Sequence, residues 1–417
     1  MRVTILGGGL MGVTTAWFLA RDGHDVSVIE RAKGLAEGTS FANAGLVTPS
    51  SADPWNSPGT LTRLLKYLGR EDSPLLLRPR ALPGMAGWGL KFLWQSRAQH
   101  HARNTEANTH LAVYSLALLR ALRAEFGLPY DETTGGTLQV FADARAFDAA
   151  ARDGERLKSF GLSAETLDPA GIVAREPALK ASGDLAGGLY FPGDESGDAH
   201  AFTKGLGECC KAAGVNFRFA ETVLGFDVNG GRIKGVRTNR RITTTDAVVI
   251  ALGTWTPALT RSIGARLPIY PVKGYSATVD IDGWNAAPRL PVLHDTLKVA
   301  TSPMGPRLRA AGTAEFAGYN TKLNPTRAQA VLRAATTLFP GLAAHAEPHR
   351  VRYWTGLRPM TPDGRPLIGR LRFDNLFVNA GHGGLGWTLA CGSGKLMADI
   401  VTGTAPEIDS TAFSPDR

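Results

Sequence analysis

The chain has 417 residues, of which 43% are hydrophobic and 20% charged, so it is not a disordered protein and is long enough for two domains. No apolar run reaches the length of a membrane span, and three cysteines without metal-ligand spacing predict neither a disulfide framework nor a metal site. A first strand expected at residue 2 leaves no room for a signal peptide, so a cytoplasmic protein is favoured. The net charge of +9 is compatible with an anionic membrane surface, an acidic partner, an anionic substrate or an arginine-rich composition.

The first thirty residues have the pattern of a nucleotide-binding βαβ unit. Its parts are a strand, three glycines at G-x-G-x-x-G spacing, a helix, a second strand and a terminal acid: Arg2–Leu6, Gly7, Gly9, Gly12, Val13–Arg21, Val26–Ile29 and Glu30. Gly7 allows a tight turn, Gly9 lets the backbone approach a pyrophosphate, and Gly12 lets the helix lie close to the strand. The helix N-terminus offers N–H groups to phosphates, and Glu30 stands where an acid binds ribose hydroxyls. The motif predicts a bound ADP moiety; the alternative is a glycine turn without a nucleotide.

A loop of small residues between Thr39 and Leu46 follows this unit, and Pro- and Ser-rich sequence continues to about residue 59. Small side chains here suit a backbone that passes close to a flat, extended ligand. Residues 60–125 are expected to be mostly helical, with candidate helices at Leu61–Leu68, Trp88–Gln95 and Asn104–Phe126.

Basic side chains are interleaved with apolar ones across residues 61–100. They are Arg63, Lys66, Arg70, Arg78, Arg80, Lys91 and Arg97. This composition is compatible with contact to a membrane surface, and equally with a helical subdomain that has a basic outer face.

The middle of the chain has a βα order again. Expected strands, helices and one hairpin lie at Thr137–Phe141, Ala144–Phe160, Gly187–Phe191, His200–Ala213, Val215–Phe219, Thr222–Asp227 with Arg232–Thr238, and Ala247–Ala251. Val215–Phe219 follows a helix and is expected to rejoin the nucleotide-binding sheet. Ala247–Ala251 runs into Gly253 and Trp255, which predicts another backbone turn beside the cofactor.

The C-terminal part combines an antiparallel sheet with a last βα unit. Residues 267–323 are rich in strands and turns, Pro325–Leu338 predicts a helix, and the buried strand Leu376–Ala380 runs into a glycine-rich turn and a helix to about residue 401. We therefore predict an α/β fold in which a Rossmann-like nucleotide-binding domain (1–60, 140–266 and 325–417) is interleaved with an α+β substrate domain built on an antiparallel sheet (61–139 and 267–324).

The glycine-rich turn at 381–388 favours FAD over NAD. A nicotinamide cofactor needs one helix N-terminus for its pyrophosphate, whereas reduced flavin carries further negative charge at its N1–C2=O edge. A second helix N-terminus, arriving from the far end of the chain, suits that edge. The cofactor is expected to be noncovalently bound FAD, with the loop from Thr39 to Gly45 on the other side of the flavin.

Several stretches together resemble the D-amino-acid oxidase superfamily of FAD-dependent oxidoreductases, and above all its bacterial D-amino acid dehydrogenases. They are the opening motif, Gly-Thr-Ser-Phe-Ala-Asn-Ala-Gly, Pro-Val-Lys-Gly-Tyr, Tyr-Trp-Thr-Gly-Leu-Arg-Pro-Met-Thr-Pro-Asp-Gly and Gly-His-Gly-Gly-Leu-Gly-Trp-Thr. The resemblance covers nearly the whole chain. Glycine oxidases, sarcosine oxidases and D-hydroxyproline dehydrogenases share much of the pattern.

The resemblance implies which residues bind the cofactor. In order along the FAD they are Gly7, Gly9, Leu10, Met11, Gly12, Glu30 and Arg31 for the ADP half; Val223 for the adenine; Gly253 and Trp255 for the middle; Thr39, Ser40, Asn43, Ala44, Gly45 and Leu46 for the ribityl chain and flavin; and Gly381, Gly383, Gly384, Leu385, Gly386, Trp387 and Thr388 for the pyrimidine edge.

The resemblance also implies catalytic residues. Arg358 matches the family arginine that holds the substrate carboxylate, and the alternative is a surface residue or a structural ion pair. Tyr275 and Tyr319 are candidates for a hydroxyl on the substrate, or are packing residues. Lys273 and His382 are candidates near the flavin, or are satisfied locally. Glycine oxidase-like relatives carry a tyrosine near Lys298, so the second partner of the carboxylate stays open.

The implied reaction is oxidative deamination of a D-amino acid to a 2-oxo acid and ammonia, by hydride transfer from Cα to flavin N5. Electrons would pass to a quinone or another respiratory acceptor, with peripheral attachment to the inner face of the plasma membrane through residues 61–100, and no nucleic acid is expected. Two alternatives stay open. One is an oxidase or dehydrogenase of glycine, sarcosine, D-proline or D-hydroxyproline; the other is a flavin-binding subunit of a larger complex with no amine site.

Overall fold

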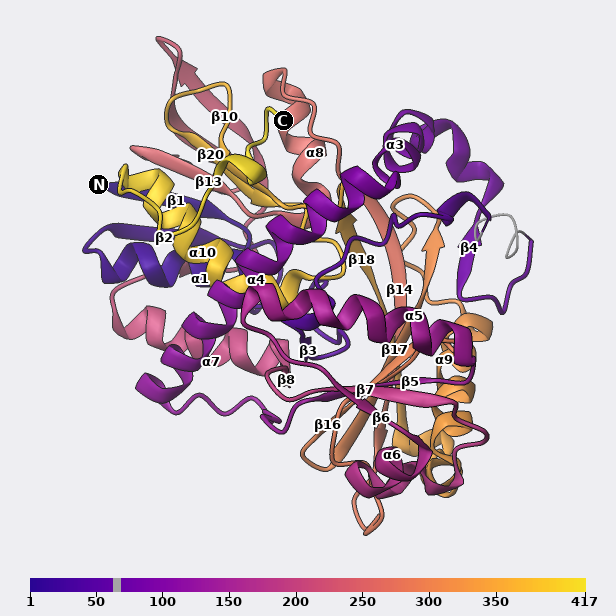
Figure 1. Ribbon diagram of the computed structural model, residues 1–417. Helices are drawn as coiled ribbons and strands as arrows, with labels where there is room; N and C mark the ends of the chain where they lie inside the picture. The colour runs from indigo at the N-terminus through magenta and orange to yellow at the C-terminus, as the bar shows by residue number, and fades with distance from the viewer. Residues whose placement is uncertain (63–68) are drawn as a thin grey trace.

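The computed structural model describes residues 1–62 and 69–417, and it contains two large sheets that the chain visits alternately (Figure 1). One sheet has six strands in the order β19-β20-β13-β1-β2-β9, and the other has nine. Two small sheets join β10, β11 and β12, and β3 with β8. Their bounds are Val223–Asn229, Arg232–Thr238, Ile242–Thr244, Leu46–Val47 and Glu195–Ser196. The predicted α/β fold class, a Rossmann-like domain with a second sheet, is confirmed.

The six-stranded sheet is the predicted nucleotide-binding sheet. Its strands are β1 (Arg2–Leu6), β2 (Asp25–Ile29), β9 (Asn216–Arg218), β13 (Ala247–Ile250), β19 (Leu367–Arg370) and β20 (Leu376–Ala380). All neighbours pair in parallel except the edge strand β19, which is antiparallel to β20. The central strands are buried on both faces, which explains their continuous apolar sequences. The prediction that 215–219 rejoins this sheet is confirmed by the pairing of β9 with β2.

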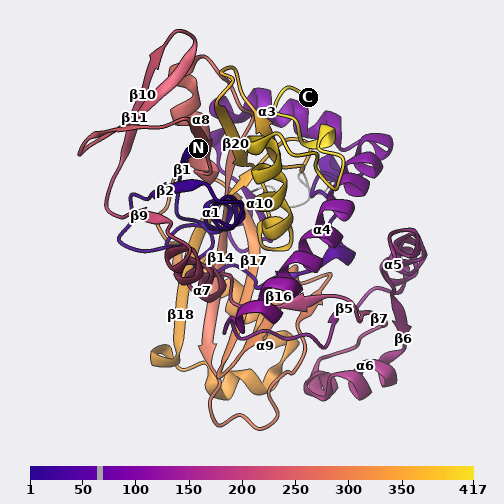
Figure 2. The same ribbon diagram turned by 90° about the vertical axis from the view of Figure 1, so that its left-hand side faces the viewer.

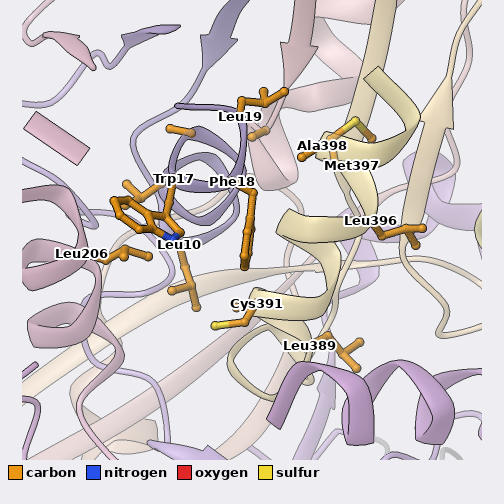
Figure 3. Close-up of a cluster of buried hydrophobic side chains, with 14 of the residues drawn as sticks. Leu10, Trp17, Phe18, Leu19, Leu206, Leu389, Cys391, Leu396, Met397 and Ala398 are labelled. Carbon is orange, nitrogen blue, oxygen red and sulfur yellow. The ribbon is translucent and has the colours of Figure 1, made fainter. Parts of the chain in front are cut away.

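Two helices that follow these strands pack against each other, although they come from opposite ends of the chain. They are α1 (Leu10–Arg21) and α10 (Gly386–Thr402). In Figure 3, Phe18 extends from α1 toward α10, while Trp17 lies toward Leu206 of α7 (Ala199–Ala212). The contact is close because Gly394 has no side chain: a Cβ there would lie 2.7 Å from Cβ of Thr14. This packing sets the N-termini of both helices beside the same end of the sheet.

The nine-stranded sheet has the order β18-β14-β17-β16-β15-β5-β7-β6, with β4 paired to β17. In chain order the strands are β4 (Leu75–Leu77), β5 (Thr137–Phe141), β6 (Glu165–Leu167), β7 (Gly187–Phe191), β14 (Tyr270–Asp280), β15 (Val292–His294), β16 (Val299–Met304), β17 (Arg307–Phe316) and β18 (Val351–Met360). Helix α9 (Pro325–Leu338) packs on β14 and β17. Its N-terminus is fixed by Asn324, whose side chain accepts hydrogen bonds from the backbone N–H groups of Thr326 and Arg327.

Strand pairing departs from the predicted division into domains. Strands β6, β7 and β18 belong to the nine-stranded sheet and helix α9 packs on it, yet all four lie in 140–266 and 325–417, which were assigned to the nucleotide-binding domain. Figure 2 shows β6 and β7 with α5 (Ala144–Glu155) and α6 (Pro169–Arg175) at the far edge from α1. An apolar strand reveals its burial but not its partner, so sheet membership could not be read from these segments.

The remaining α-helices of the described residues are α3 (Leu82–Gln95), α4 (Ala98–Phe126) and α8 (Thr256–Thr260). The candidate helix at 61–68 falls mostly on residues 63–68, outside the described part of the chain. Among the described helices, none combines the length and the hydropathy that crossing a membrane requires.

Candidate cofactor and substrate cavity

A cavity of about 1330 Å³ is lined by residues of both large sheets. Most of the predicted cofactor residues lie on its wall: Gly7, Gly9, Leu10, Met11, Glu30, Arg31, Thr39, Ser40, Asn43, Ala44, Gly45, Leu46, Val223, Gly253, Trp255, Gly383, Gly384, Leu385, Gly386, Trp387 and Thr388. Gly12 and Gly381 are not part of the wall. The structure thus brings together segments that span most of the chain.

The glycines that begin α1 have distinct roles. Gly7 has φ +109°, and a Cβ there would lie 2.6 Å from the carbonyl oxygen of Ala251. Gly12 packs the helix onto the strand, because its Cβ would lie 1.9 Å from the oxygen of Gly7. Gly9 faces open space, with no atom within 4 Å of the Cβ position, and no side chain caps the helix. The N–H groups of Gly7 and Gly8 are bonded to the carbonyl of Ile29 and to Glu30, whereas the N-terminus of α1 that follows has no side-chain cap and is available to a phosphate that approaches the backbone.

Glu30 lies at the end of β2 on the cavity wall. One carboxylate oxygen accepts a hydrogen bond from the N–H of Gly8 and the other from the N–H of Ala32, both at 2.7 Å. Each carboxylate oxygen has a second lone pair, so this fixed orientation still leaves acceptors for ribose hydroxyls. The neighbouring Arg31 places its guanidinium carbon 4.5 Å from the ring centroid of Trp255, which closes this part of the wall.

The loop before β3 lines the cavity where the two sheets meet. Thr39 donates a hydrogen bond of 2.8 Å to the carbonyl of Leu357 in β18, and Ser302 of β16 donates one of 2.7 Å to the carbonyl of Ala44. Gly45 has φ +79°, and its Cβ would lie 2.1 Å from Cε of Met304. Glycine is therefore required at position 45 for the close passage of this loop between the sheets.

The glycine-rich turn after β20 begins α10 on the same cavity. Its first residues have no side-chain cap, as in α1. The hydroxyl of Thr388 accepts a hydrogen bond from the N–H of Thr48, and the indole of Trp387 donates to the carbonyl of Gly197, both at 3.1 Å. Two uncapped helix N-termini thus face one cavity. Together with the open space at Gly9, this arrangement fits FAD, which carries a diphosphate and becomes negatively charged at the flavin on reduction.

Arg358 of β18 lies on the wall of this cavity and is half-buried. Its Nη1 donates a 3.0 Å hydrogen bond to the carbonyl of Thr313, and its guanidinium carbon lies 5.0 Å from the ring centroid of Trp55. Among the described residues no carboxylate lies within ion-pair distance of it. Loss of hydration lowers the pKa of Arg358 to about 10, so it stays protonated at neutral pH. A partly desolvated cation without an anion is a site for an anionic group of a ligand.

Two aromatic residues of the cavity wall were not singled out from the sequence. Trp55 lies on the cavity wall and packs against Gly384, where a Cβ would be 3.2 Å from its ring. Trp354, which precedes Arg358 on β18, also lines the cavity and covers Gly356, whose Cβ would meet its ring at 2.0 Å. Trp55 sits in the Pro- and Ser-rich segment and carries no local signal of function, since its partners Arg358 and Gly384 lie near the other end of the chain.

His382 lines the cavity but is buried, with Nε2 at 3.0 Å from the hydroxyl of Ser393. Burial lowers its pKa to about 3, so the imidazole is neutral across the physiological range. It is therefore a fixed polar group beside the glycine turn, and it does not change charge between about pH 5 and 8.

Two other predicted catalytic residues, Tyr275 and Lys273, lie at a buried charge cluster around Glu315. Tyr275 touches the cavity, but its hydroxyl donates to Glu315. Lys273 is not on the wall: its Nζ donates to the carbonyl of Lys322 and lies 3.9 Å from Glu315. Arg78, at 2.6 Å from Glu315, belongs to the same cluster and also pairs with Glu71. Lys273 is thus satisfied locally by Glu315 and the carbonyl of Lys322, which is the alternative that the sequence left open.

Tyr319 is also away from the cavity wall and 44% exposed. Its hydroxyl donates a 2.9 Å hydrogen bond to the carbonyl of Thr254, and its ring centroid lies 5.0 Å from that of Trp255. Tyr319 therefore supports Trp255, in agreement with the packing role that the sequence left open. Among the described residues, no cluster of side chains suited to a metal ion is present.

Comparison with known proteins agrees with this geometry. The family model described as "FAD dependent oxidoreductase" (DAO) matches residues 2–400. A D-amino acid dehydrogenase of Methylobacterium nodulans is 46% identical over 100% of this chain and 99% of its own length, and one of Dechloromonas aromatica is 46% identical over 98% of each. In fold, the chain is similar to glycine oxidase from Geobacillus kaustophilus, with a TM-score of 0.79 and 24% identity over 100% of this chain and 99% of the other. It is also similar to L-proline dehydrogenase from P. horikoshii, with a TM-score of 0.79 and 20% identity over 99% of this chain and 96% of the other.

The family model matches nearly the whole length of the chain, and the cavity between the two helix N-termini fits the FAD that this family binds. The chain belongs to the DAO family of FAD-dependent oxidoreductases, and its cofactor is FAD.

Proposed function

We propose that this enzyme oxidises D-amino acids with small or apolar side chains to 2-oxo acids and ammonia, and passes the electrons to a quinone or another respiratory acceptor. The observation that carries the proposal is Arg358: a half-buried guanidinium without a carboxylate partner among the described residues, on the wall of the FAD cavity. Relatives of 46% identity that are named D-amino acid dehydrogenase support the choice of D-amino acids.

The residues around Arg358 suit an amino acid. Its planar guanidinium can bind the substrate carboxylate through two parallel hydrogen bonds, which fixes the Cα–H bond relative to the cofactor. Bound FAD supplies the two-electron acceptor for the hydride from Cα. The imino acid formed is hydrolysed by water, so the protein needs no strong acid or base, in keeping with the neutral His382.

The wall next to Arg358 indicates the side-chain preference. Leu75 of β4 pairs with Ala314, the residue after the Arg358 acceptor, and Phe316 and Phe92 continue this apolar surface along the cavity. An ionised side chain would lose hydration there without a partner. We therefore expect D-alanine, D-valine and D-phenylalanine to be better substrates than D-aspartate or D-lysine.

The reaction is tested with purified holoenzyme in air, by following hydrogen peroxide and the reduction of an artificial quinone or dye separately. D-amino acids should reduce the dye with little peroxide, and L-amino acids should not. Turnover restricted to glycine, sarcosine or D-proline would replace this proposal by the amine-oxidase alternative. No reduction by any amine would favour a flavin subunit without an amine site.

Helix α3 offers a surface for the membrane that holds a respiratory acceptor. Its outer face exposes Leu82, Leu90 and Trp94, of which Leu90 is 72% exposed, beside Lys91 and Arg97. Apolar and basic side chains together favour a surface of anionic lipid. Arg63 and Lys66 of the predicted basic region lie outside the described residues. Cosedimentation with anionic vesicles tests this contact: binding should be lost in Leu90→Glu but not in Ile242→Glu, a change at an exposed position of β12 outside the cavity wall. Equal binding of both variants would refute the contact.

A further inference from the structure

The strand pair beside Arg358 contains an irregularity. In the pairing of β14 with β17, Lys273 lies opposite Glu315 and Tyr275 lies opposite Gly312. Gly274 alone therefore faces two residues, Thr313 and Ala314. This is a β-bulge, a feature that redirects backbone and side-chain groups and is frequent next to active sites.

Thr313 holds an unfavourable backbone conformation within the bulge. Its φ is +58°, which is costly for a β-branched residue, and its hydroxyl is buried without a hydrogen-bond partner among the described residues. This conformation directs its carbonyl to Nη1 of Arg358 at 3.0 Å. The next carbonyl, of Ala314, instead accepts a 3.3 Å hydrogen bond from the buried Arg327. Each of the two bulge carbonyls thus binds a different arginine.

Gly274 provides the space for the guanidinium. A Cβ at this position would lie 2.1 Å from Nη1, 2.4 Å from Cζ and 2.6 Å from Nη2 of Arg358. Gly274 does not have a positive φ, so its backbone would accept alanine. Glycine is needed here for the arginine's position and not for the strand's conformation.

We propose that Gly274 and Thr313 are positioning residues that fix the guanidinium of Arg358 for the substrate carboxylate, an inference that rests on the proposed function. Thr313 takes one N–H of Nη1, and the other N–H groups of the fork remain for the carboxylate. Lys298, near the position where a second carboxylate partner was expected, also lines the cavity but pairs with Asp295 at 2.7 Å. One arginine held in a fixed orientation can then bind the carboxylate without a second cation.

The test is anaerobic reduction of the bound flavin by D-alanine in rapid mixing, which separates the substrate Kd from the limiting rate of reduction. Wild type, Gly274→Ala, Arg358→Ala and the double variant are compared. Reduction of the wild-type flavin by D-alanine tests the proposed function. If D-alanine does not reduce it, that function is refuted, whatever the result for Gly274→Ala. If D-alanine reduces it, Gly274→Ala should raise Kd by roughly tenfold to a hundredfold, with a smaller change in the limiting rate.

The double variant distinguishes positioning from general damage. Removing the arginine side chain makes room for the new Cβ, so Gly274→Ala should add no more than about twofold to the Kd of Arg358→Ala. Gly225→Ala is a matched control: its Cβ would also approach a guanidinium, Nη2 of Arg237 at 3.0 Å, in the small three-stranded sheet. The proposal would be overturned if the two substitutions raised the Kd for D-alanine additively, or if Gly274→Ala left this Kd unchanged. A Gly274→Ala variant that fails to bind FAD while the double variant binds it would support the steric contact.

Thr313→Gly separates the carbonyl from the side chain. Glycine adopts a positive φ without strain and keeps the backbone carbonyl. The Kd for D-alanine should stay within about twofold of wild type. A rise comparable to that of Gly274→Ala would show that the side chain, and not the carbonyl, orients the arginine.

Discussion

Two parts of the cavity wall are built in different ways. The nucleotide region comes from the continuous segment 7–31 and presents mainly backbone N–H groups and glycines, with Gly12 packed behind the wall. The arginine region, formed by Trp55, Gly274, Thr313 and Arg358, joins four separate segments and depends on a side chain. Phosphate recognition needs only a local backbone geometry, whereas a substrate carboxylate needs a cation that distant strands hold in place. The difference predicts that the two regions can be damaged independently.

The largest effect is expected from a change in the nucleotide region. In Gly12→Ala the Cβ would lie 1.9 Å from the oxygen of Gly7, and neither atom belongs to a flexible side chain. Helix α1 must then move from β1, and we expect the purified protein to lack FAD, as measured by the ratio of flavin to protein absorbance. Gly87→Ala on α3, where the Cβ meets no atom within 4 Å, is the control. A yellow Gly12→Ala protein with normal FAD content would contradict the close-packing role.

Damage to the arginine region should leave the cofactor in place. Arg358→Ala removes the cation for the substrate carboxylate, a loss of about 2–5 kcal/mol, or roughly 30-fold to several thousandfold in kcat/KM. FAD content should match wild type. Arg352→Ala, an exposed position on the same strand, should change kcat/KM by no more than about twofold. Loss of FAD in Arg358→Ala would show that the two regions are not independent.

A smaller effect is expected at Trp55, which contributes a cation–π contact to the arginine. Trp55→Ala should cost about 0.5–2 kcal/mol, seen as a rise in KM of roughly twofold to thirtyfold. Trp55→Phe should recover part of it. If both variants raise KM equally, the aromatic contact with Arg358 is not what Trp55 provides.

A titratable group outside both regions should affect stability alone. Asp194 is buried and accepts hydrogen bonds from Ser50 and Thr137, and burial raises its pKa to about 6. The folded state therefore binds the proton more tightly than the unfolded chain does. This stabilisation is present below about pH 4 and is lost as the pH rises through about 6, up to roughly 3 kcal/mol.

The side chain introduced by Asp194→Asn does not titrate. The Tm of this variant minus the Tm of wild type should therefore be larger, by a few degrees, at about pH 7.5 than at about pH 4.5. The Tm is read from release of flavin fluorescence at each pH. FAD content and the substrate Kd should be unchanged. A Tm difference independent of pH would show that Asp194 does not carry a raised pKa.

The same contrast explains what the sequence could predict. Strands β5 and β20 and helix α9 have the predicted bounds, because hydrophobic periodicity, proline and turn residues act locally. The glycine turns and their shared cavity followed from local motifs together with the resemblance to a family. The assignment of β6, β7 and β18 to a sheet did not, because strand pairing is a long-range property.

The arginine region shows the same limit of prediction from sequence. Arg358 was found through a family motif, but nothing local marks Trp55, and Thr313 acts through a backbone angle that no residue pattern reveals. Lys273 has the chemistry of a catalytic group, yet Glu315 and the carbonyl of Lys322 hold it behind the wall. Residue type could suggest these roles, and only the positions of their partners could decide between them.

The most direct measurement of the central claim is the visible spectrum of the anaerobic holoenzyme during addition of D-alanine. The account predicts loss of the oxidised flavin absorbance in wild type and, at the same concentration, almost none in Arg358→Ala with its full FAD content. Equal bleaching of both proteins would contradict the claim that Arg358 binds the substrate carboxylate beside the FAD.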